Sequence, residues 1–172
     1  SPGNYGLDFM KETYGYDLDA SVKCSNFIGE TIDMAVECGF EKMLLTGHIG
    51  KLVKVSGGIM NTHSREADCR VELLVAAGLR AGVSRDNLMK ILDSATTTEA
   101  IAYLEEEKKT KPVMDYLMER IIYYMNKRAG GKMKIECILY DNQYGELAKS
   151  EGAEEFLHEL QHENVNANET TI

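Results

Sequence analysis

The sequence predicts an α/β fold, in which helices pack against a parallel sheet and the second half of the chain is largely helical. Short apolar runs such as Met43-Leu44-Leu45 are typical of strands buried in a parallel sheet. Longer stretches with apolar residues three and four positions apart are typical of amphipathic helices. Hydrophobic residues make up 44% of the 172 positions, which is enough for the core of one domain.

The first part of the chain is expected to form one strand–helix–strand unit, after a helix over residues 8–14. Residues 21–24 are a candidate strand. Residues 27–38 have apolar positions at helical spacing, and Gly39 can end that helix in the left-handed conformation. Residues 42–46 supply the next strand. The unit therefore predicts two neighbouring parallel strands joined by a helix.

The second part of the chain is expected to be a run of helices that leads to one more strand. Ser64 and Ser84 are expected to cap two of these helices, and Thr96 with Glu99 has the spacing of a capping box. Gly130 is expected to end the last one before the strand. The expected helices cover residues 48–55, 64–81, 84–93, 96–107 and 112–129, and the strand covers residues 133–140.

The chain is expected to consist of a domain over residues 1–149 and an acidic tail with a short helix over residues 150–172. From Asp141 onward, eight acidic residues stand against one lysine. The chain starts Ser1-Pro2-Gly3 without an initiator methionine. This turn-like beginning predicts a fragment or one half of a larger protein. The sequence leaves the oligomeric state open, with a homo-oligomer among the alternatives.

The charge is unevenly distributed, and this points to an anionic ligand. The formal net charge is −9, yet residues 42–65 contain no Asp or Glu and carry lysine, arginine and histidine. An acid-free basic segment in an acidic protein favours a local anion site, while the overall charge argues against a nucleic acid partner. No apolar run is long enough to span a membrane. The four dispersed cysteines favour free thiols in a reducing cytoplasm.

Four loops rich in Gly, Asn or Ser are expected to meet at one edge of the sheet. They cover residues 2–6, 24–29, 46–51 and 140–145. Loops that follow parallel strands lie along the same edge, where helix amino termini converge and ligands bind. The alternative is that each is an ordinary turn. Together, they predict one ligand site.

Three recognisable motifs are rejected or discounted. Gly47-His48-Ile49-Gly50-Lys51 has too few residues between its glycines for a phosphate-binding P-loop, and the dinucleotide-binding fingerprint is absent. Residues 158–162 match the zinc-peptidase pattern H-E-x-x-H, but they lie in the acidic tail with little structure around them. The prediction is a solvated helix and no metal ligand in the chain.

Basic residues after the second strand are candidates for holding carboxylates or phosphates. His48, Lys51 and Lys54 follow one another at three-residue steps, close to the start of a helix. The alternative is a solvated basic face. The polar segment 61–65 precedes an apolar helix, and it is either a simple cap or a part of the site.

Residues 22–65 resemble the cobalt-precorrin-5B C(1)-methyltransferase family of anaerobic cobalamin biosynthesis. The matching segments are Val-Lys-Cys-Ser-Asn-Phe-Ile-Gly at 22–29, Leu-Thr-Gly-His-Ile-Gly-Lys-Leu-Val-Lys at 45–54 and Gly-Ile-Met-Asn-Thr-His-Ser-Arg-Glu-Ala-Asp at 58–68. Residues 2–6 are similar to the family's segment that enters this half. The resemblance implies a Rossmann-like three-layer domain, S-adenosylmethionine as methyl donor and a cobalt-precorrin tetrapyrrole as acceptor. It also implies a separate amino-terminal domain, so that this chain would be the carboxyl-terminal half of a larger protein with its first domain absent.

The resemblance and the loops together assign candidate roles. His48 and His63 are the candidate catalytic residues, and the sequence does not decide whether either removes a proton or approaches the cobalt. The candidate donor-binding residues are Gly3, Asn4, Gly6, Ser25 and Asn26. The candidate acceptor-binding residues are His48, Lys51, Lys54, Asn61, Thr62 and Arg65. The alternatives are an α/β enzyme that binds a phosphorylated metabolite and a non-catalytic half that docks to the missing domain.

Overall fold

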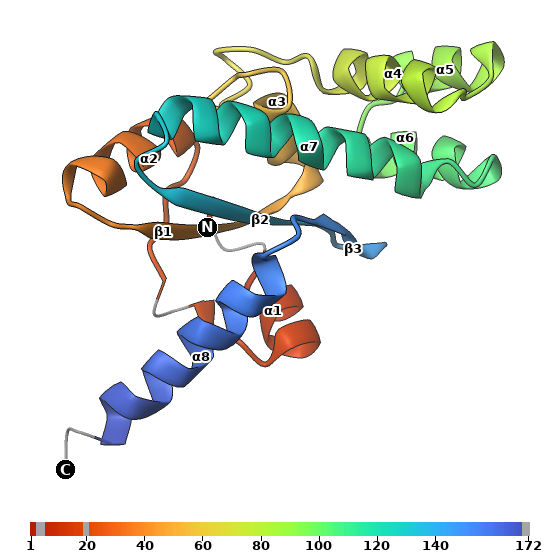
Figure 1. Cartoon of the computed structure of the whole chain (residues 1–172). Helices are drawn as coiled ribbons and strands as arrows, with labels where there is room; N and C mark the ends of the chain where they lie inside the picture. The colour runs from red at the N-terminus through yellow and green to blue at the C-terminus, as the bar shows by residue number, and fades with distance from the viewer. Residues whose placement is uncertain (3–5, 19–20, 170–172) are drawn as a thin grey trace.

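The computed structural model describes residues 1–2, 6–18 and 21–169, and in this part of the chain it has eight helices and three strands (Figure 1). The helices are α1 (Leu7–Tyr14), α2 (Ile28–Glu37), α3 (Ile49–Val55), α4 (Arg70–Ala81), α5 (Arg85–Leu92), α6 (Thr97–Glu106), α7 (Thr110–Ala129) and α8 (Ala153–Glu169). The strands are β1 (Lys42–His48), β2 (Lys134–Asp141) and β3 (Gly145–Lys149). The expected α/β class is confirmed. No helix of the described residues is long and apolar enough to cross a membrane.

The three strands form one mixed sheet in the order β1-β2-β3. β1 and β2 are parallel, with Lys42 opposite Lys134 and His48 opposite Tyr140. β3 is antiparallel to β2, so the prediction of a wholly parallel sheet is wrong. The reason is a tight turn after β2: the Asp141 carboxylate accepts the Gln143 N–H at 2.8 Å, and this side-chain turn reverses the chain.

The expected strand over residues 21–24 is absent, and this prediction is wrong. The Ser1 amino group donates to the Val22 carbonyl at 2.7 Å, and the Cys24 N–H donates to the Ser1 carbonyl at 2.9 Å. The segment thus bonds to the start of the chain instead of joining the sheet. The parallel crossover in the described sheet runs from β1 to β2, through the helices α3 to α7.

Four of the predicted caps agree with the structure, two at helix starts and two at helix ends. Ser84 accepts the Asn87 N–H at the start of α5, and Thr96 accepts the Glu99 N–H at 3.1 Å at the start of α6. Gly39 and Gly130 have φ angles of 78° and 61°, which the left-handed helix end requires. These boundaries follow from local side-chain chemistry and therefore agree with the sequence pattern.

Helices α4 and α8 differ from their predictions. α4 begins at Arg70, so Ser64 is not its N-cap, and residues 64–66 form a turn instead. The His63 ring accepts the Arg65 N–H at 3.1 Å and holds that turn. α8 runs for 17 residues, longer than the short helix expected, and its Ala153 and Leu157 are buried.

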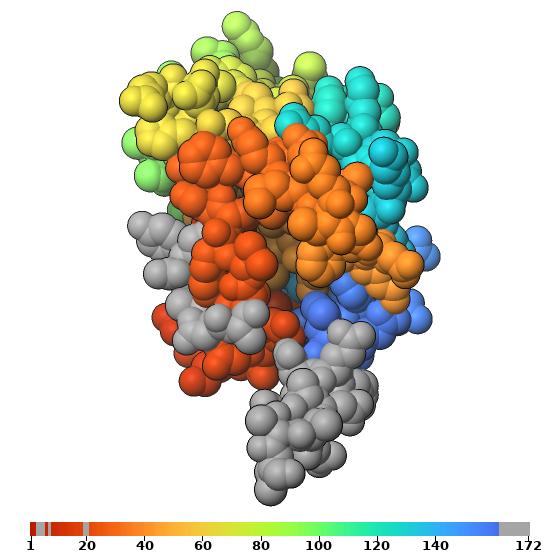
Figure 2. All heavy atoms as spheres, turned by 90° about the vertical axis from the view of Figure 1, so that its left-hand side faces the viewer, coloured from red at the N-terminus to blue at the C-terminus, as the bar shows by residue number. Residues whose placement is uncertain are grey.

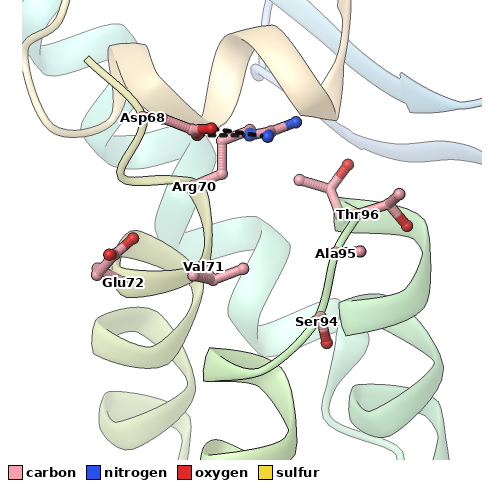
Figure 3. Close-up of a pocket in the computed structure, with 8 residues that line it drawn as sticks. Asp68, Arg70, Val71, Glu72, Ser94, Ala95 and Thr96 are labelled. Atoms are coloured by element: carbon pink, nitrogen blue, oxygen red, sulfur yellow. Dashed lines mark hydrogen bonds and ion pairs between the residues drawn. The ribbon is translucent and has the colours of Figure 1, made fainter. Parts of the chain in front are cut away.

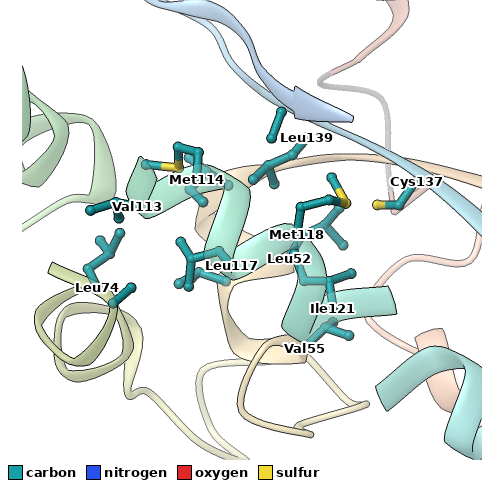
Figure 4. Close-up of a cluster of buried hydrophobic side chains, with 14 of the residues drawn as sticks. Leu52, Val55, Leu74, Val113, Met114, Leu117, Met118, Ile121, Cys137 and Leu139 are labelled. Atoms are coloured by element: carbon teal, nitrogen blue, oxygen red, sulfur yellow. The ribbon is translucent and has the colours of Figure 1, made fainter. Parts of the chain in front are cut away.

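The main core lies between the sheet and helix α7. α7 buries Val113, Met114, Leu117, Met118, Ile121 and Met125, which recur at helical spacing against α3, α4 and β2 (Figure 4). A second, smaller cluster lies on the other face of the sheet. It joins Met10 and Leu18 to Ile138 of β2 and to Leu157 of α8, so helices cover both faces (Figure 1).

Shortening Ile121, which has no exposed surface, should lower the free energy of unfolding. We expect Ile121→Ala to cost about 2–5 kcal/mol, because it removes buried methyl groups and leaves a cavity. The exposed Leu79, with 69% of its surface accessible, provides the control, and Leu79→Ala should change stability by less than about 0.5 kcal/mol. Urea unfolding followed by circular dichroism measures both. Equal losses would contradict the placement of the core beneath α7.

Candidate functional site

The candidate site lies where the parallel strands β1 and β2 end. β1 ends at His48, and the next residue begins α3, whereas β2 ends at Asp141 and continues into the turn before β3. His48 is opposite Tyr140 in the register. The two strand ends therefore bring the 46–51 and 140–145 loops next to each other.

Both ring nitrogens of His48 have partners. Nδ1 accepts the Gly50 N–H at 3.0 Å and thereby caps α3. Nε2 lies 3.3 Å from Oδ2 of Asp141. Since Nδ1 accepts, this network assigns the proton of the neutral ring to Nε2, which donates to Asp141. Burial lowers the pKa of His48, and the Asp141 charge partly opposes this effect. His48 is thus a fixed, neutral ring with no nitrogen free to accept a proton.

Asp141 is a site residue that the sequence reasoning did not single out. Its side chain is completely buried. Oδ2 accepts the Thr98 hydroxyl at 2.8 Å, and Oδ1 accepts the Gln143 N–H. A buried carboxylate requires such partners, because burial without them is very costly. Its position at the end of an apolar strand was the available signal. The contact with Thr98 adds the start of α6 to the site.

Lys51 connects the start of α3 to two of the predicted loops. Its ammonium donates to the Pro2 carbonyl at 3.1 Å and lies 3.4 Å from the Ser25 carbonyl. Burial lowers the pKa of Lys51. Gly6, in the first loop, lies against the Tyr140 hydroxyl, where a β-carbon would come within 2.4 Å of it. The contacts thus bring the described parts of all four loops together.

Lys54 is buried, with 2% of its surface exposed. Its ammonium donates to the Thr62 carbonyl at 3.1 Å. A buried lysine requires such an acceptor, and this one fixes the loop that follows α3. The alternative interpretation of His48, Lys51 and Lys54 as a solvated basic face is therefore wrong. The Lys54 ammonium thus places a positive charge in the interior, next to the loop that carries Thr62.

The loops 24–29 and 60–62 are hydrogen-bonded to each other. The Thr62 N–H donates to the Asn26 carbonyl at 2.9 Å, and the Thr62 hydroxyl lies 3.3 Å from Asn26 Oδ1. Phe27 and Asn61 form an isolated antiparallel bridge. At Gly29, a β-carbon would come within 2.7 Å of the Met60 side chain, so the close approach requires glycine. Figure 2 shows the segments before α2 and after α3 next to each other on one face.

His63 and Arg65 lie on the exposed side of this loop pair. The Asn61 side-chain oxygen accepts the His63 N–H at 3.1 Å, and His63 Nδ1 accepts the Arg65 N–H at 3.1 Å. The neutral His63 ring therefore carries its proton on Nε2, as His48 does. The exposed loop offers hydrogen-bond donors and a guanidinium rather than a proton acceptor. Gly3 and Asn4, two of the candidate donor-binding residues, lie outside the described residues.

The described residues hold no group of three or more His, Cys, Asp or Glu side chains that could bind a metal ion. In the H-E-x-x-H segment, Glu159 forms an ion pair with Lys42 at 2.5 Å, and His158 is exposed. The side chain of His162 lies outside the description. The four cysteines, Cys24, Cys38, Cys69 and Cys137, are free thiols.

The His48 geometry predicts that acid weakens the fold. Because the pKa of His48 is lowered from about 6.5, the unfolded chain takes up this proton first as the pH falls. The stability that the neutral ring contributes is therefore complete above about pH 6.5 and is lost below it. Urea unfolding at about pH 7.5 and about pH 5.5 should show a smaller loss in His48→Asn than in the wild type, since asparagine keeps a capping group without titrating.

If His48→Asn loses as much stability as the wild type between these two pH values, the buried environment of His48 is not the cause of the pH dependence.

Comparison with known proteins identifies the family. Residues 61–151, more than half of the chain, match the family model described as CbiD, C-terminal domain. A cobalt-precorrin-5B C(1)-methyltransferase of Ruminiclostridium cellulolyticum is 44% identical over 147 residues, which is 86% of this chain and 38% of the relative. A protein of the same name from Alkaliphilus metalliredigens is 38% identical, over 95% of this chain and 43% of the relative. Another, from Methanocaldococcus jannaschii, is also 38% identical, over 87% of this chain and 41% of the relative.

The chain thus spans about two fifths of the length of these curated relatives. No solved structure matches it. The match to the family model covers the loop with Asn61, Thr62, His63 and Arg65, and continues through helix α7 and strands β2 and β3. On this evidence, the chain belongs to the CbiD family.

Proposed function

We propose that this chain takes part in the S-adenosylmethionine-dependent methylation of carbon 1 of cobalt-precorrin-5B, in anaerobic cobalamin biosynthesis. The observation that carries the proposal is the family membership together with the printed name of relatives up to 44% identical. The described geometry supports it, because cations and hydrogen-bond donors converge on one edge of the sheet. Such a site suits an acceptor with several carboxylate side chains.

The proposed acceptor contacts come from α3 and the loop after it. Lys51 has a partly exposed ammonium near two loops, and Arg65 and His63 are exposed on the neighbouring loop. His63 presents an N–H, and Arg65 presents a planar fork of donors that matches a carboxylate. The buried Lys54 ammonium adds to the positive electrostatic potential of this loop. In a protein of net charge −9, this local positive potential selects polyanions that the rest of the surface repels.

The proposed donor contacts come from the 2–6 and 24–29 loops. Ser25 is exposed and Asn26 is partly exposed, and the Asn26 amide group can donate to a ribose or an amino-acid carboxylate. Gly6, Gly3 and Asn4 complete the proposed set. When bound, the donor supplies an electrophilic methyl group on a sulfonium. The protein then has to orient the two substrates and exclude water, which does not require a nucleophilic side chain.

The geometry of the two candidate catalytic histidines favours hydrogen-bond donation over proton abstraction. In both rings, Nδ1 accepts a backbone N–H. His63 can direct Nε2–H toward the acceptor, whereas His48 holds Asp141 and the start of α3 in place. We therefore propose that His63 touches the acceptor and that His48 positions the loop that carries Lys51.

The rest of the proposal concerns the whole protein. The chain matches only 38% of a relative's length, which supports an amino-terminal domain that completes the site. Helices on both faces of the sheet support a Rossmann-like three-layer arrangement. Free thiols at all four cysteines support a cytoplasmic location.

Removing the charge of Lys51 should weaken acceptor binding. Lys51→Met keeps the aliphatic stem and loses the ammonium, so we expect the affinity for a cobalt tetrapyrrole polycarboxylate to fall about ten- to a hundredfold. The affinity of the wild type should also fall as salt rises. Absorbance titration of the full-length protein at two salt concentrations measures both effects. Lys127→Met on the exposed side of α7 is the control, and equal affinities in the two variants would exclude Lys51 from the acceptor site.

Truncating Asn26 should weaken donor binding. The expected result for Asn26→Ala is an affinity for S-adenosylhomocysteine about tenfold lower, measured by calorimetry, because a hydrogen bond to a polar ligand group is lost. Asn126→Ala, at an exposed position of α7, should bind as the wild type does. An unchanged affinity in Asn26→Ala would remove the 24–29 loop from the donor site.

A further inference from the structure

The strand β1 lies at the edge of the described sheet, where β2 is its neighbour on one side. The Lys134 N–H donates to the Glu41 carbonyl at 2.8 Å, so the backbone groups of Glu41 and Met43 face β2. Backbone groups point alternately to the two sides of a strand, and those of Leu44 and Thr46 therefore face the other side. There, no described residue is hydrogen-bonded to them.

Thr46 combines a buried position with polar groups that lack a partner. The residue is only 4% exposed, and its hydroxyl, like its N–H, is hydrogen-bonded to no described residue. Buried polar groups nearly always have a partner. The cavity between the starts of α4 and α6 is different, because there Asp68 holds the Arg70 guanidinium through two hydrogen bonds (Figure 3). The edge of β1 therefore indicates an additional neighbour.

The start of the chain lies between β1 and the segment before α2. The Ser1 amino group donates to the Val22 carbonyl, and the Ser1 carbonyl accepts the Cys24 N–H, which is the bonding pattern of two parallel strands. On the other side, a β-carbon at Gly47 would come within 3.0 Å of the Pro2 ring. Figure 1 accordingly places the amino terminus beside the sheet. The chain thus enters this domain along the free edge of β1.

We propose that the free edge of β1 docks an extended strand from the amino-terminal part of the same protein, which runs parallel to β1 and leads into Ser1. This inference rests on the proposed function for the existence of that part, which the longer relatives support. Because Ser1 directs its backbone groups toward residues 22–24, those of the residue before it face β1. That residue comes beside Leu45, where it accepts the Thr46 N–H and donates to the Leu44 carbonyl.

The two faces of the sheet determine the chemistry of the docked strand. On one face, the side chain before Ser1 lies between the buried Leu45 and Val22, which is 75% exposed in this chain. On the other face, Leu44 packs against the cluster that contains Ile138. A parallel strand with both faces covered is apolar throughout. The occupant is therefore a run of about five residues that are mainly apolar and β-branched.

Amide hydrogen exchange in the full-length protein, measured by NMR, tests the docked strand. The Met43 and Leu45 amides face β2 and provide the internal control for slow exchange. If the strand docks, the Leu44 and Thr46 amides should exchange about as slowly as these controls. On an unpaired edge they would exchange at least about a hundredfold faster, and this alternation along β1 would overturn the proposal.

A nuclear Overhauser effect identifies the occupant. A parallel neighbour brings its α-proton close to the Leu44 amide, so we expect a cross-peak from a residue that precedes Ser1 in the full-length protein. A cross-peak from a second copy of the chain, lost on dilution, would overturn the assignment.

A pair of substitutions tests the contact with Val22. Val22→Asp places a carboxylate beside the apolar strand, so exchange at Leu44 and Thr46 should become about tenfold faster in the full-length protein. Leu79→Asp is the control, because Leu79 is similarly exposed, at 69%, on helix α4, and it should leave both rates unchanged. Equal effects of the two substitutions would contradict the contact.

These measurements do not depend on activity. If exchange is uniformly slow along β1 but the protein binds neither S-adenosylhomocysteine nor a cobalt tetrapyrrole, the proposed function fails and the docked strand stands.

Discussion

The arrangement of the site depends on one buried carboxylate, that of Asp141. A charge without solvent contact is stable only if hydrogen bonds replace its hydration, and here those bonds come from the turn after β2, from Thr98 at the start of α6 and from the His48 ring. Each partner belongs to a different element. The requirement to satisfy one carboxylate therefore fixes the positions of three chain segments relative to the sheet.

A buried lysine and a partly buried one fix the outer loops in a similar manner. Lys51 bonds to the carbonyls of Pro2 and Ser25, and Lys54 bonds to the carbonyl of Thr62. When an ammonium is removed from water, hydrogen bonds to backbone carbonyls replace its hydration. These bonds order the loops that carry the carbonyls. The same side chains contribute the positive potential on which the proposed acceptor binding rests. The structural role and the proposed functional role thus coincide on α3, the shortest helix of the described part.

The sequence predicted the parts of the fold that depend on local chemistry. The capping box at Thr96 and the glycine after α7 define helix ends within a few residues, so their patterns were sufficient. The pairing of the 21–24 segment with Ser1, the return of β3 along β2 and the delayed start of α4 depend on contacts between distant residues or on a single side-chain turn. Apolar periodicity carries no information on such contacts. Asp141 was missed for the same reason. A single acidic residue at the end of a strand forms no sequence motif, and its partners Thr98 and His48 are distant in the sequence and meet it only in the fold.

The close contacts at two glycines bear on how motifs of this family should be interpreted. A β-carbon at Gly29 would come within 2.7 Å of Met60, and one at Gly47 within 2.8 Å of Leu52. Both glycines lie in the segments that make the chain recognisable, and both have a sufficient explanation in packing alone. A relative that kept these glycines but replaced the exposed Arg65 would still be detected by the same motifs and would form the same loops. Recognition of the family and retention of the proposed acceptor-binding residues are therefore separable properties.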